Sequence, residues 1–219
     1  MAQQLAVKIG RFGHLCLFSG LEDKNLKLFS KVVVQTDRGL EVGELVSLPK
    51  CGAKNATKEI KLKKILKYLD DKDKAQLEKV AKKEAQAREL IEAKIKEYEL
   101  PMRLFSVEVL FDLKRCVFYY KETEEKKSLS LRDLRRDLST ALMMKIELKS
   151  LTARDAAKLV GGYGVCGKEL CCCAWLDKPR QVSVKMVKQQ GLSISPSKTS
   201  GACGRLLCCL SYEAEGEHP

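Results

Sequence analysis

Two near-identical cysteine loops, residues 164–172 and 201–209, hold the residues of this chain best suited to chemistry. Each contains a cysteine followed by glycine, then a basic residue, a variable position, a leucine and a pair of adjacent cysteines. The copies lie 37 residues apart, because the first cysteine is Cys166 in one and Cys203 in the other. Thiolates bind zinc and iron–sulfur clusters. The repeat therefore predicts a metal site to which each loop contributes half of the ligands.

The first cysteine of each loop is the leading candidate ligand. A glycine directly after it lets backbone N–H groups approach the sulfur, which stabilises a thiolate and tunes a cluster. The second ligand of each loop is either member of the adjacent pair, with Cys171 and Cys208 favoured and Cys172 and Cys209 as alternates. The cofactor ligands predicted in this way are Cys166, Cys171, Cys203 and Cys208. The remaining cysteines of the region either complete a site shared with a partner or pack into the fold.

The spacing within each loop bears on which metal is bound. Four residues separate the first cysteine from the adjacent pair, whereas common zinc knuckles use a gap of about two. One class of ferredoxins uses a four-residue gap, and a cluster is larger than a single zinc ion. The wide loop therefore favours an iron–sulfur cluster, with zinc as the alternative.

Composition and hydropathy predict a cytoplasmic protein with no membrane insertion. The N-terminus has no basic segment followed by a long apolar run, and no stretch approaches the roughly 20 apolar residues of a membrane span. In a reducing cytosol, clustered cysteines are more often metal ligands or redox groups than disulfides. We therefore expect the ten cysteines of the chain to be thiols or ligands.

Positive charge is concentrated around the cysteine loops. The chain has a net charge of +12, and residues 145–210 hold eleven basic and four acidic side chains. Positive surroundings lower thiol pKa values, so we expect these residues to keep the thiols ionised. The same charge attracts phosphate, which makes RNA a candidate partner. A zinc-stabilised RNA-binding protein that uses Lys185, Lys188 and Arg205 is the resulting alternative function.

The hydrophobic pattern predicts an α+β fold. Short β-branched runs open the chain, with a hairpin turn at residues 37–39. A charged helix of roughly 25 residues follows Asp70 and Asp71 and ends before Pro101, while residues 54–69 stay open between strand and helix. A strand, strand, helix, strand, helix (ββαβα) unit comes next, with a capping box from Thr152 to Asp155, and leads into the cysteine-rich metal-binding region. The predicted divisions are a β-rich module (1–53), a charged connecting and helical segment (54–100), an α/β module (101–160) and the cysteine-rich region (161–219).

Two enzymatic interpretations lack the sequence context they require. Residues 162–167 match the dinucleotide-binding pattern G-x-G-x-x-G, but they follow a predicted helix and no βαβ unit surrounds them. A thiol redox enzyme would need a Cys-x-x-Cys motif beside a thioredoxin-like pattern, and neither histidine lies within the cysteine loops. The sequence therefore favours neither a dinucleotide-binding enzyme nor a thiol redox enzyme.

Several motifs across most of the chain are similar to those of one bacterial family. They lie at residues 39–44, 100–102, 132–134, 145–148, 161–172, 182–186, 190–193, 196–198 and 203–209. On these motifs the chain resembles the RicT/YaaT family, whose members carry the polymerase-suppressor-protein C-terminal domain. The chain departs from the family pattern by carrying Cys173.

The resemblance implies a non-enzymatic subunit of a small regulatory complex. The complex binds clusters of the 4Fe–4S type and contains other small regulatory subunits. It works with the membrane-associated endoribonuclease, ribonuclease Y, in messenger RNA processing. It affects sporulation and related developmental programmes. We expect this chain to share these properties because it resembles the family.

Overall fold

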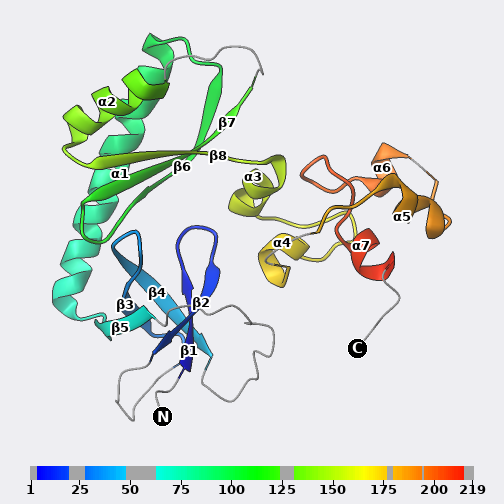
Figure 1. The fold of residues 1–219 in the computed structure, drawn as a ribbon, viewed down its shortest axis with the longest axis horizontal. Helices are drawn as coiled ribbons and strands as arrows, with labels where there is room; N and C mark the ends of the chain where they lie inside the picture. Colours follow the sequence, from blue (N-terminus) through cyan, green and yellow to red (C-terminus); the bar gives the residue numbers. More distant parts are fainter. Residues whose placement is uncertain are drawn as a thin grey trace. The chain divides into compact units, whose positions relative to one another are not determined.

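A computed structural model of the chain divides into two compact units, residues 1–149 and 150–219 (Figure 1). The structure describes residues 4–19, 28–47, 63–123, 131–176, 180–193 and 195–214. The predicted mixed α+β class is confirmed, with a β-rich N-terminal part followed by helices and strands. The finer division into four segments stays a prediction.

The first unit begins with a closed β-barrel. Its strands are β1 (Gln4–Ile9), β2 (His14–Ser19), β3 (Lys31–Gln35), β4 (Leu40–Ser47) and β5 (Lys63–Tyr68). The strand order is β1-β2-β5-β3-β4, and β4 pairs with β1 to close the barrel. The predicted hairpin turn is confirmed, because Thr36 and Gly39 exchange backbone hydrogen bonds between β3 and β4. Residues 54–69, for which the sequence did not distinguish strand from helix, contain β5. This strand runs parallel to β2 and antiparallel to β3.

The barrel closes around an apolar core that leaves no room for a side chain at Gly43. Val7, Phe18 and Leu45 are fully buried in this core. Gly43 of β4 pairs with Ile9 of β1. A Cβ atom at position 43 would overlap the Val7 side chain and lie 3.0 Å from the Lys8 backbone oxygen. Glycine therefore allows the close approach of β1 and β4 that closes the barrel.

The predicted long helix is confirmed as α1 (Asp71–Glu97), which has 27 residues. At its start, the Asp73 carboxylate accepts a hydrogen bond from the Asp70 N–H at 3.0 Å. Val80, Ala87 and Ile91 form its buried stripe. Its remaining surface carries charges of both signs that form ion pairs such as Arg88–Glu92 and Lys94–Glu97. The helix is thus amphipathic, with a narrow apolar face and a solvated charged face.

The second part of this unit is a three-stranded sheet with two helices packed on it. The order β6-β7-β8 comprises β6 (Met102–Val109), β7 (Arg115–Glu122) and β8 (Lys145–Ser150), and α2 (Leu131–Leu142) connects β7 to β8. One core joins side chains of α1, α2 and the sheet, including Leu138 and Phe118. Cys116 lies in this core and is 0% exposed, as expected of a small buried hydrophobe, and burial raises the pKa of its thiol to about 12.

Buried polar contacts join the barrel to the sheet. Arg38, from the β3–β4 turn, forms ion pairs with Glu41 at 2.8 Å and with Glu108 of β6 at 3.4 Å. The Tyr119 hydroxyl donates to Glu108 at 2.6 Å, and the Tyr119 ring meets the Phe12 ring edge-on at 5.2 Å. Burial alone would lower the pKa of Arg38, but the bond to Glu41 and the charge of Glu108 raise it. The barrel and the three-stranded sheet therefore share a polar contact in which Glu41 and Glu108 stabilise the positive charge of Arg38.

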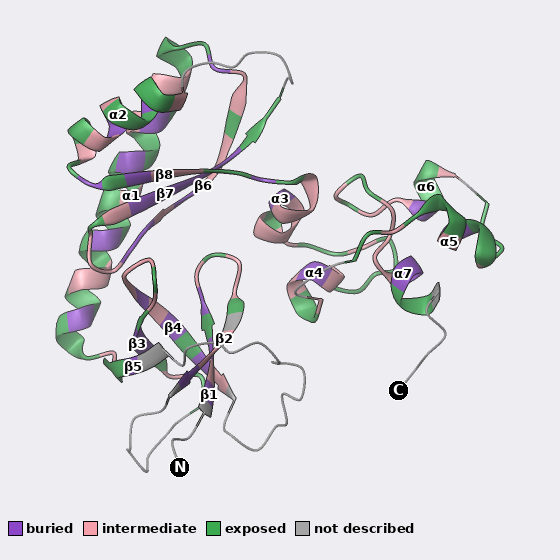
Figure 2. Cartoon of the chain, viewed as in Figure 1, coloured by how far each residue is buried: buried purple, intermediate pink, exposed green. Residues whose placement is uncertain are grey.

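The second unit is built from short helices. They are α3 (Ala153–Val160), α4 (Cys171–Ala174), α5 (Val184–Gln189), α6 (Pro196–Thr199) and α7 (Cys209–Ala214). The predicted capping box is confirmed, because Thr152 accepts from the Asp155 N–H and the Asp155 carboxylate accepts from the Thr152 N–H. Figure 2 shows mostly exposed and intermediate residues in this unit. Its buried apolar side chains are few and include Cys172, Val187 and Leu210.

No helix within the described part of the chain is both long enough and apolar enough to cross a membrane.

The close approach at Gly43 can be tested by substitution. We expect Gly43→Ala to lower the free energy of unfolding by about 1–3 kcal/mol, the usual cost of overpacking a core. The neighbouring Glu44 is exposed, so Glu44→Ala should change it by less than about 0.5 kcal/mol. Urea unfolding followed by far-ultraviolet circular dichroism measures both. Equal effects of the two substitutions would contradict the packing argument.

Candidate metal centre

The first cysteine loop is a tight turn followed by a left-handed glycine. The Gly164 carbonyl accepts a hydrogen bond from the Gly167 N–H at 2.9 Å, and this bond closes a turn with Cys166 at its third position. Gly167 has φ of 76°, and the Gly164 N–H then donates to the Lys168 carbonyl at 2.8 Å. This is the arrangement of hairpins with a glycine bulge. A Cβ atom at Gly167 would meet no atom within 4 Å, so the backbone conformation is what requires glycine here.

The second loop repeats these features 37 residues later. The Gly201 carbonyl accepts from the Gly204 N–H at 2.9 Å, and the Gly201 N–H donates to the Arg205 carbonyl at 2.8 Å. Gly204 has φ of 73°. The isolated β-bridge Tyr163–Glu169 of the first loop corresponds to Ser200–Leu206 of the second. The sequence repeat is therefore a repeat of local structure.

Aromatic residues at equivalent positions of the two repeats touch each other. Trp175 and Tyr212 each lie three residues after the adjacent cysteine pair of their loop. Their ring centroids are 5.2 Å apart in an edge-to-face arrangement. Both rings remain about half exposed. The contact holds the ends of the two repeats side by side, which the sequence analysis did not predict.

The predicted ligand cysteines differ in exposure. All nine cysteines in the described part of the chain are free thiols. Cys166 is exposed and Cys172 is buried, whereas Cys171, Cys203, Cys208 and Cys209 are half-buried. A short helical segment begins at the adjacent pair of each repeat, α4 at Cys171 and α7 at Cys209.

Thiols from both loops lie within electrostatic reach of one another. Cys208 is affected by the charges of Cys171 and Cys203, and Cys209 by the charge of Cys171. Cys172 is affected by its neighbour Cys173 and by Cys208. The fold thus gathers the cysteines that the repeat predicts as partners.

The gathered thiols do not surround a single point. No three His, Cys, Asp or Glu side chains of the described residues form a group that could hold one metal ion. The structure therefore brings five of the six predicted ligands into one neighbourhood, with the exposed Cys166 the exception to these contacts. The assignment of individual ligands stays a prediction.

The expectation that basic neighbours keep the thiols ionised is wrong for three of them. Burial raises the pKa of Cys172 to about 11, and the charges of nearby cysteines add to the effect. Burial also raises the pKa values of Cys208 and Cys209. The free energy lost when a thiolate is removed from water exceeds the stabilisation that distant cations provide. Lys185, Lys188 and Arg205 are exposed, so solvent screens their charge.

Arg154 is the cation that lowers the pKa of Cys208, although it does not offset burial. It lies in the first turn of α3, which the capping box at Thr152 fixes. Its Nε atom is buried and has no hydrogen-bond partner among the described residues. Arg154 was not predictable from the sequence, because a single arginine inside a capping box gives no signal of a site.

The Nε of Arg154, which has no partner among the residues that the structure describes, fits a negatively charged group held by the cysteines. An unsatisfied buried donor costs about 1–3 kcal/mol, and more when the group is charged. Thiolates and the sulfide ions of a cluster are anionic acceptors that would satisfy it. Soft sulfur donors are also the ligands that zinc and iron–sulfur clusters take. The donor atoms of the cysteines therefore suit either group, and which of the two they bind stays a prediction.

Comparisons with known proteins agree on one relationship. Residues 63–151 match the PSP1 C-terminal conserved region, and residues 181–216 match the third domain of PSP1-like proteins. The chain is 38% identical over 184 residues to the Stage 0 sporulation protein YaaT of Bacillus subtilis (strain 168). This alignment covers 84% of the chain and 66% of the relative, slightly less than two thirds of its length. No solved structure matches the chain.

The raised thiol pKa values predict slow alkylation in metal-free protein. At pH 7.5 we expect iodoacetamide to modify the exposed Cys166 well before the buried Cys172. The Cys172 rate should rise steadily as pH approaches about 11, because the thiolate is the reactive form. Tandem mass spectrometry of timed samples locates each label.

The same shift has a consequence for stability with a defined sign. The Cys172 pKa is higher in the folded chain than in the unfolded chain, so the folded state binds more protons between pH 9 and about 11. The free energy of unfolding of metal-free protein should fall over that range. Rapid labelling of Cys172 at pH 7.5 together with flat stability over that range would contradict both expectations.

Proposed function

The chain belongs to the YaaT/PSP1 family, and on this premise we propose that it is a non-enzymatic regulatory subunit that holds a 4Fe–4S cluster between its two cysteine loops. The relative from Bacillus subtilis is named as a stage 0 sporulation protein, which supports a regulatory role. The family resemblance supports the cluster and the partners, which are other small regulatory subunits and ribonuclease Y.

The observation that carries the proposal is the repeated loop. Two copies of one glycine turn present a cysteine each, and the thiols that follow them lie within electrostatic reach across the repeat. Without a metal these half-buried thiols stay protonated, and a bound metal displaces the protons because the thiolate is the ligand. The ligands would be Cys166, Cys171, Cys203 and Cys208, with Cys172 and Cys209 as alternates.

Two features favour a cluster over a single zinc ion. Each loop has four residues between its first cysteine and the adjacent pair, a wider gap than the two residues typical of zinc knuckles and one that a class of ferredoxins uses. The buried N–H of Arg154 also has no acceptor within the described part of the chain. Sulfide and thiolate sulfurs of a cluster take such hydrogen bonds, which tune the reduction potential.

The residues of the chain would have distinct tasks around the cluster. The left-handed glycines Gly167 and Gly204 orient the loops, and Arg154 supplies a fixed positive charge and a donor. When bound, the cluster supplies a redox-sensitive and oxygen-sensitive group. Trp175 and Tyr212 are exposed beside the loops and offer a binding surface for a partner subunit. The affinity of the partner would then depend on whether the loops are ordered.

One observation favours the second candidate, a zinc-stabilised RNA-binding protein. Lys185, Lys188 and Arg205 are exposed in a stretch, residues 178–208, that contains no acidic residue. Exposed cations without nearby carboxylates are suited to phosphate contacts. Metal analysis separates the two candidates, because they require different metals at the same thiols.

The cluster proposal predicts the metal content of anaerobically purified protein. We expect about four iron and four sulfide per chain, as a 4Fe–4S cluster requires, together with brown visible absorption. Cys166→Ser and Cys203→Ser should each lose most of the iron, since each removes the first ligand of one loop. Cys16→Ala, in the barrel, should keep it. Colourless protein with one zinc per chain would overturn the cluster and support the alternative.

We expect the substitution Arg154→Met to have opposite effects in metal-free and in cluster-loaded protein. In metal-free protein Arg154→Met should raise the melting temperature or leave it unchanged, because it removes an unsatisfied buried donor. In cluster-loaded protein the same substitution should speed cluster loss in air and lower the reduction potential, because it removes a donor and a positive charge from beside the sulfurs.

The control for this prediction is Lys198→Gln, which removes an exposed charge from the same unit and should change none of these quantities. If Arg154→Met left the potential and the rate of cluster loss unchanged in iron-loaded protein, Arg154 would have no role at the cluster. That result would leave the cluster itself in place.

A further inference from the structure

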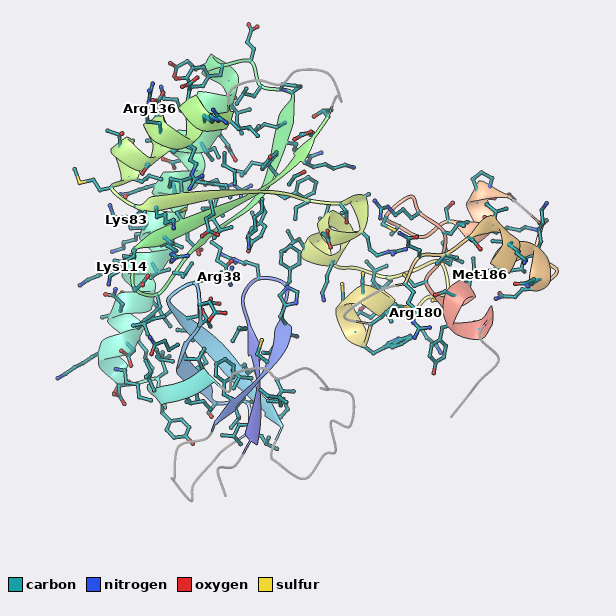
Figure 3. The ribbon with its side chains drawn as sticks, viewed as in Figure 1. Arg38, Lys83, Lys114, Arg136, Arg180 and Met186 are labelled. Carbon is teal, nitrogen blue, oxygen red and sulfur yellow. The ribbon has the colours of Figure 1, made fainter. Side chains whose placement is uncertain are left out.

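A hollow lined by arginines lies on α2, in the first unit and outside the cysteine region. It has a volume of about 420 Å³, and the residues that line it are Arg132, Arg135, Arg136, Ser139 and Thr140. Positions three and four residues apart share one face of a helix, so these side chains form a single stripe. The buried residues Leu134 and Leu138 hold α2 against the core. The arginine stripe is exposed, and Figure 3 labels Arg136 on this helix.

The stability of the helix does not explain this stripe. Arg132 has like-charged neighbours at Arg135 and Arg136, and such pairs destabilise a helix. The basic residues also lie in the first half of α2, near the positive end of the helix dipole, and its last turn contains none. Arg136 has one exposed ion pair, with Asp133 at 3.7 Å, which contributes little. An arrangement that costs stability indicates a ligand of negative charge.

The choice of arginine narrows the ligand to groups that accept two parallel hydrogen bonds. The chain contains 30 lysines and 11 arginines, yet α2 has three arginines and no lysine. The guanidinium fork binds phosphate and carboxylate groups through two bonds, which an ammonium group cannot do. Ser139 and Thr140 donate their hydroxyl protons to the carbonyls of Met144 and Arg136. The guanidinium groups are therefore the donors that face the hollow.

The lining of the hollow favours nucleic acid over an acidic protein. Protein interfaces centre on buried aromatic and apolar side chains, and none of the described residues that line this hollow is one. A phosphodiester backbone needs only repeated cationic donors, and the net charge of +12 steers a polyanion towards the protein. We propose that the arginine stripe of α2 binds the phosphate backbone of nucleic acid without reading its sequence.

Binding of fluorescently labelled single-stranded RNA, measured by anisotropy at several salt concentrations, tests this proposal in the full chain. The variant Arg132→Gln/Arg135→Gln/Arg136→Gln should bind about tenfold or more weakly, with a salt slope reduced by about two, since about 0.7 is lost per phosphate contact. Substitution of the same three arginines by lysine should retain part of the affinity. DNA of the same sequence should bind similarly, because the contacts are to phosphate.

Two matched variants remove the same charge elsewhere. Lys79→Gln/Lys82→Gln/Lys83→Gln, on the exposed face of α1, should bind nearly as the unchanged protein does. Lys185→Gln/Lys188→Gln/Arg205→Gln tests the surface of the alternative function. Equal affinity of the α2 variant and the α1 variant would overturn the proposal, as would absence of RNA and DNA binding in the unchanged protein. Circular dichroism should show the α2 variant to be folded, since it removes like-charge repulsion.

Iron and sulfide measured on the same preparations keep the two proposals separate. The α2 variant should retain the metal content of the unchanged protein while losing RNA affinity. If only the variant at positions 185, 188 and 205 lost RNA affinity, the α2 site would be overturned. RNA would then bind the cysteine region instead.

Discussion

Both cysteine loops depend on one backbone constraint, the left-handed conformation of the glycine after the first cysteine. Gly167 and Gly204 have φ values of 76° and 73°, a region that costs other residues about 1–2 kcal/mol. Each glycine follows a turn closed by the same hydrogen bond and is followed by the same return bond. The repeated turns carry the chain in equivalent paths, which explains why Trp175 and Tyr212 meet from equivalent positions.

Local signals made much of the fold predictable. The long helix α1, the hairpin turn before Gly39 and the capping box at Thr152 each depend on a few neighbouring residues, and each has its predicted place. The closed barrel was not predictable in this way. Lysines fill much of β5, and its strand identity comes from pairing with β2 and β3, which lie far away in the chain. Such non-local pairing leaves no periodic pattern in the segment itself.

In the candidate site, too, the sequence predicted the features that depend on local pattern but not those that depend on three-dimensional surroundings. The repeat predicted two loops that belong to one site, and thiols of both loops lie within electrostatic reach of one another. Counting charges along the chain, in contrast, gave the wrong sign for the thiol pKa values of Cys172, Cys208 and Cys209. Burial and the mutual repulsion of thiolates depend on three-dimensional proximity, as does the contribution of Arg154. Lysines close in sequence to the loops remain in solvent, where their charge has little effect on the sulfurs.

The unequal packing of the two units determines what loss of a bound group would do. The two large apolar cores both lie in the first unit, which therefore does not need a metal to hold its strands and α2 in place. The second unit buries few apolar side chains, and a small core of this kind usually needs a cross-link or metal to become stable. Binding at the cysteines would therefore order the second unit selectively. A change at the thiols would then alter the surface around Trp175 and Tyr212, while the arginine stripe on α2 keeps its structure.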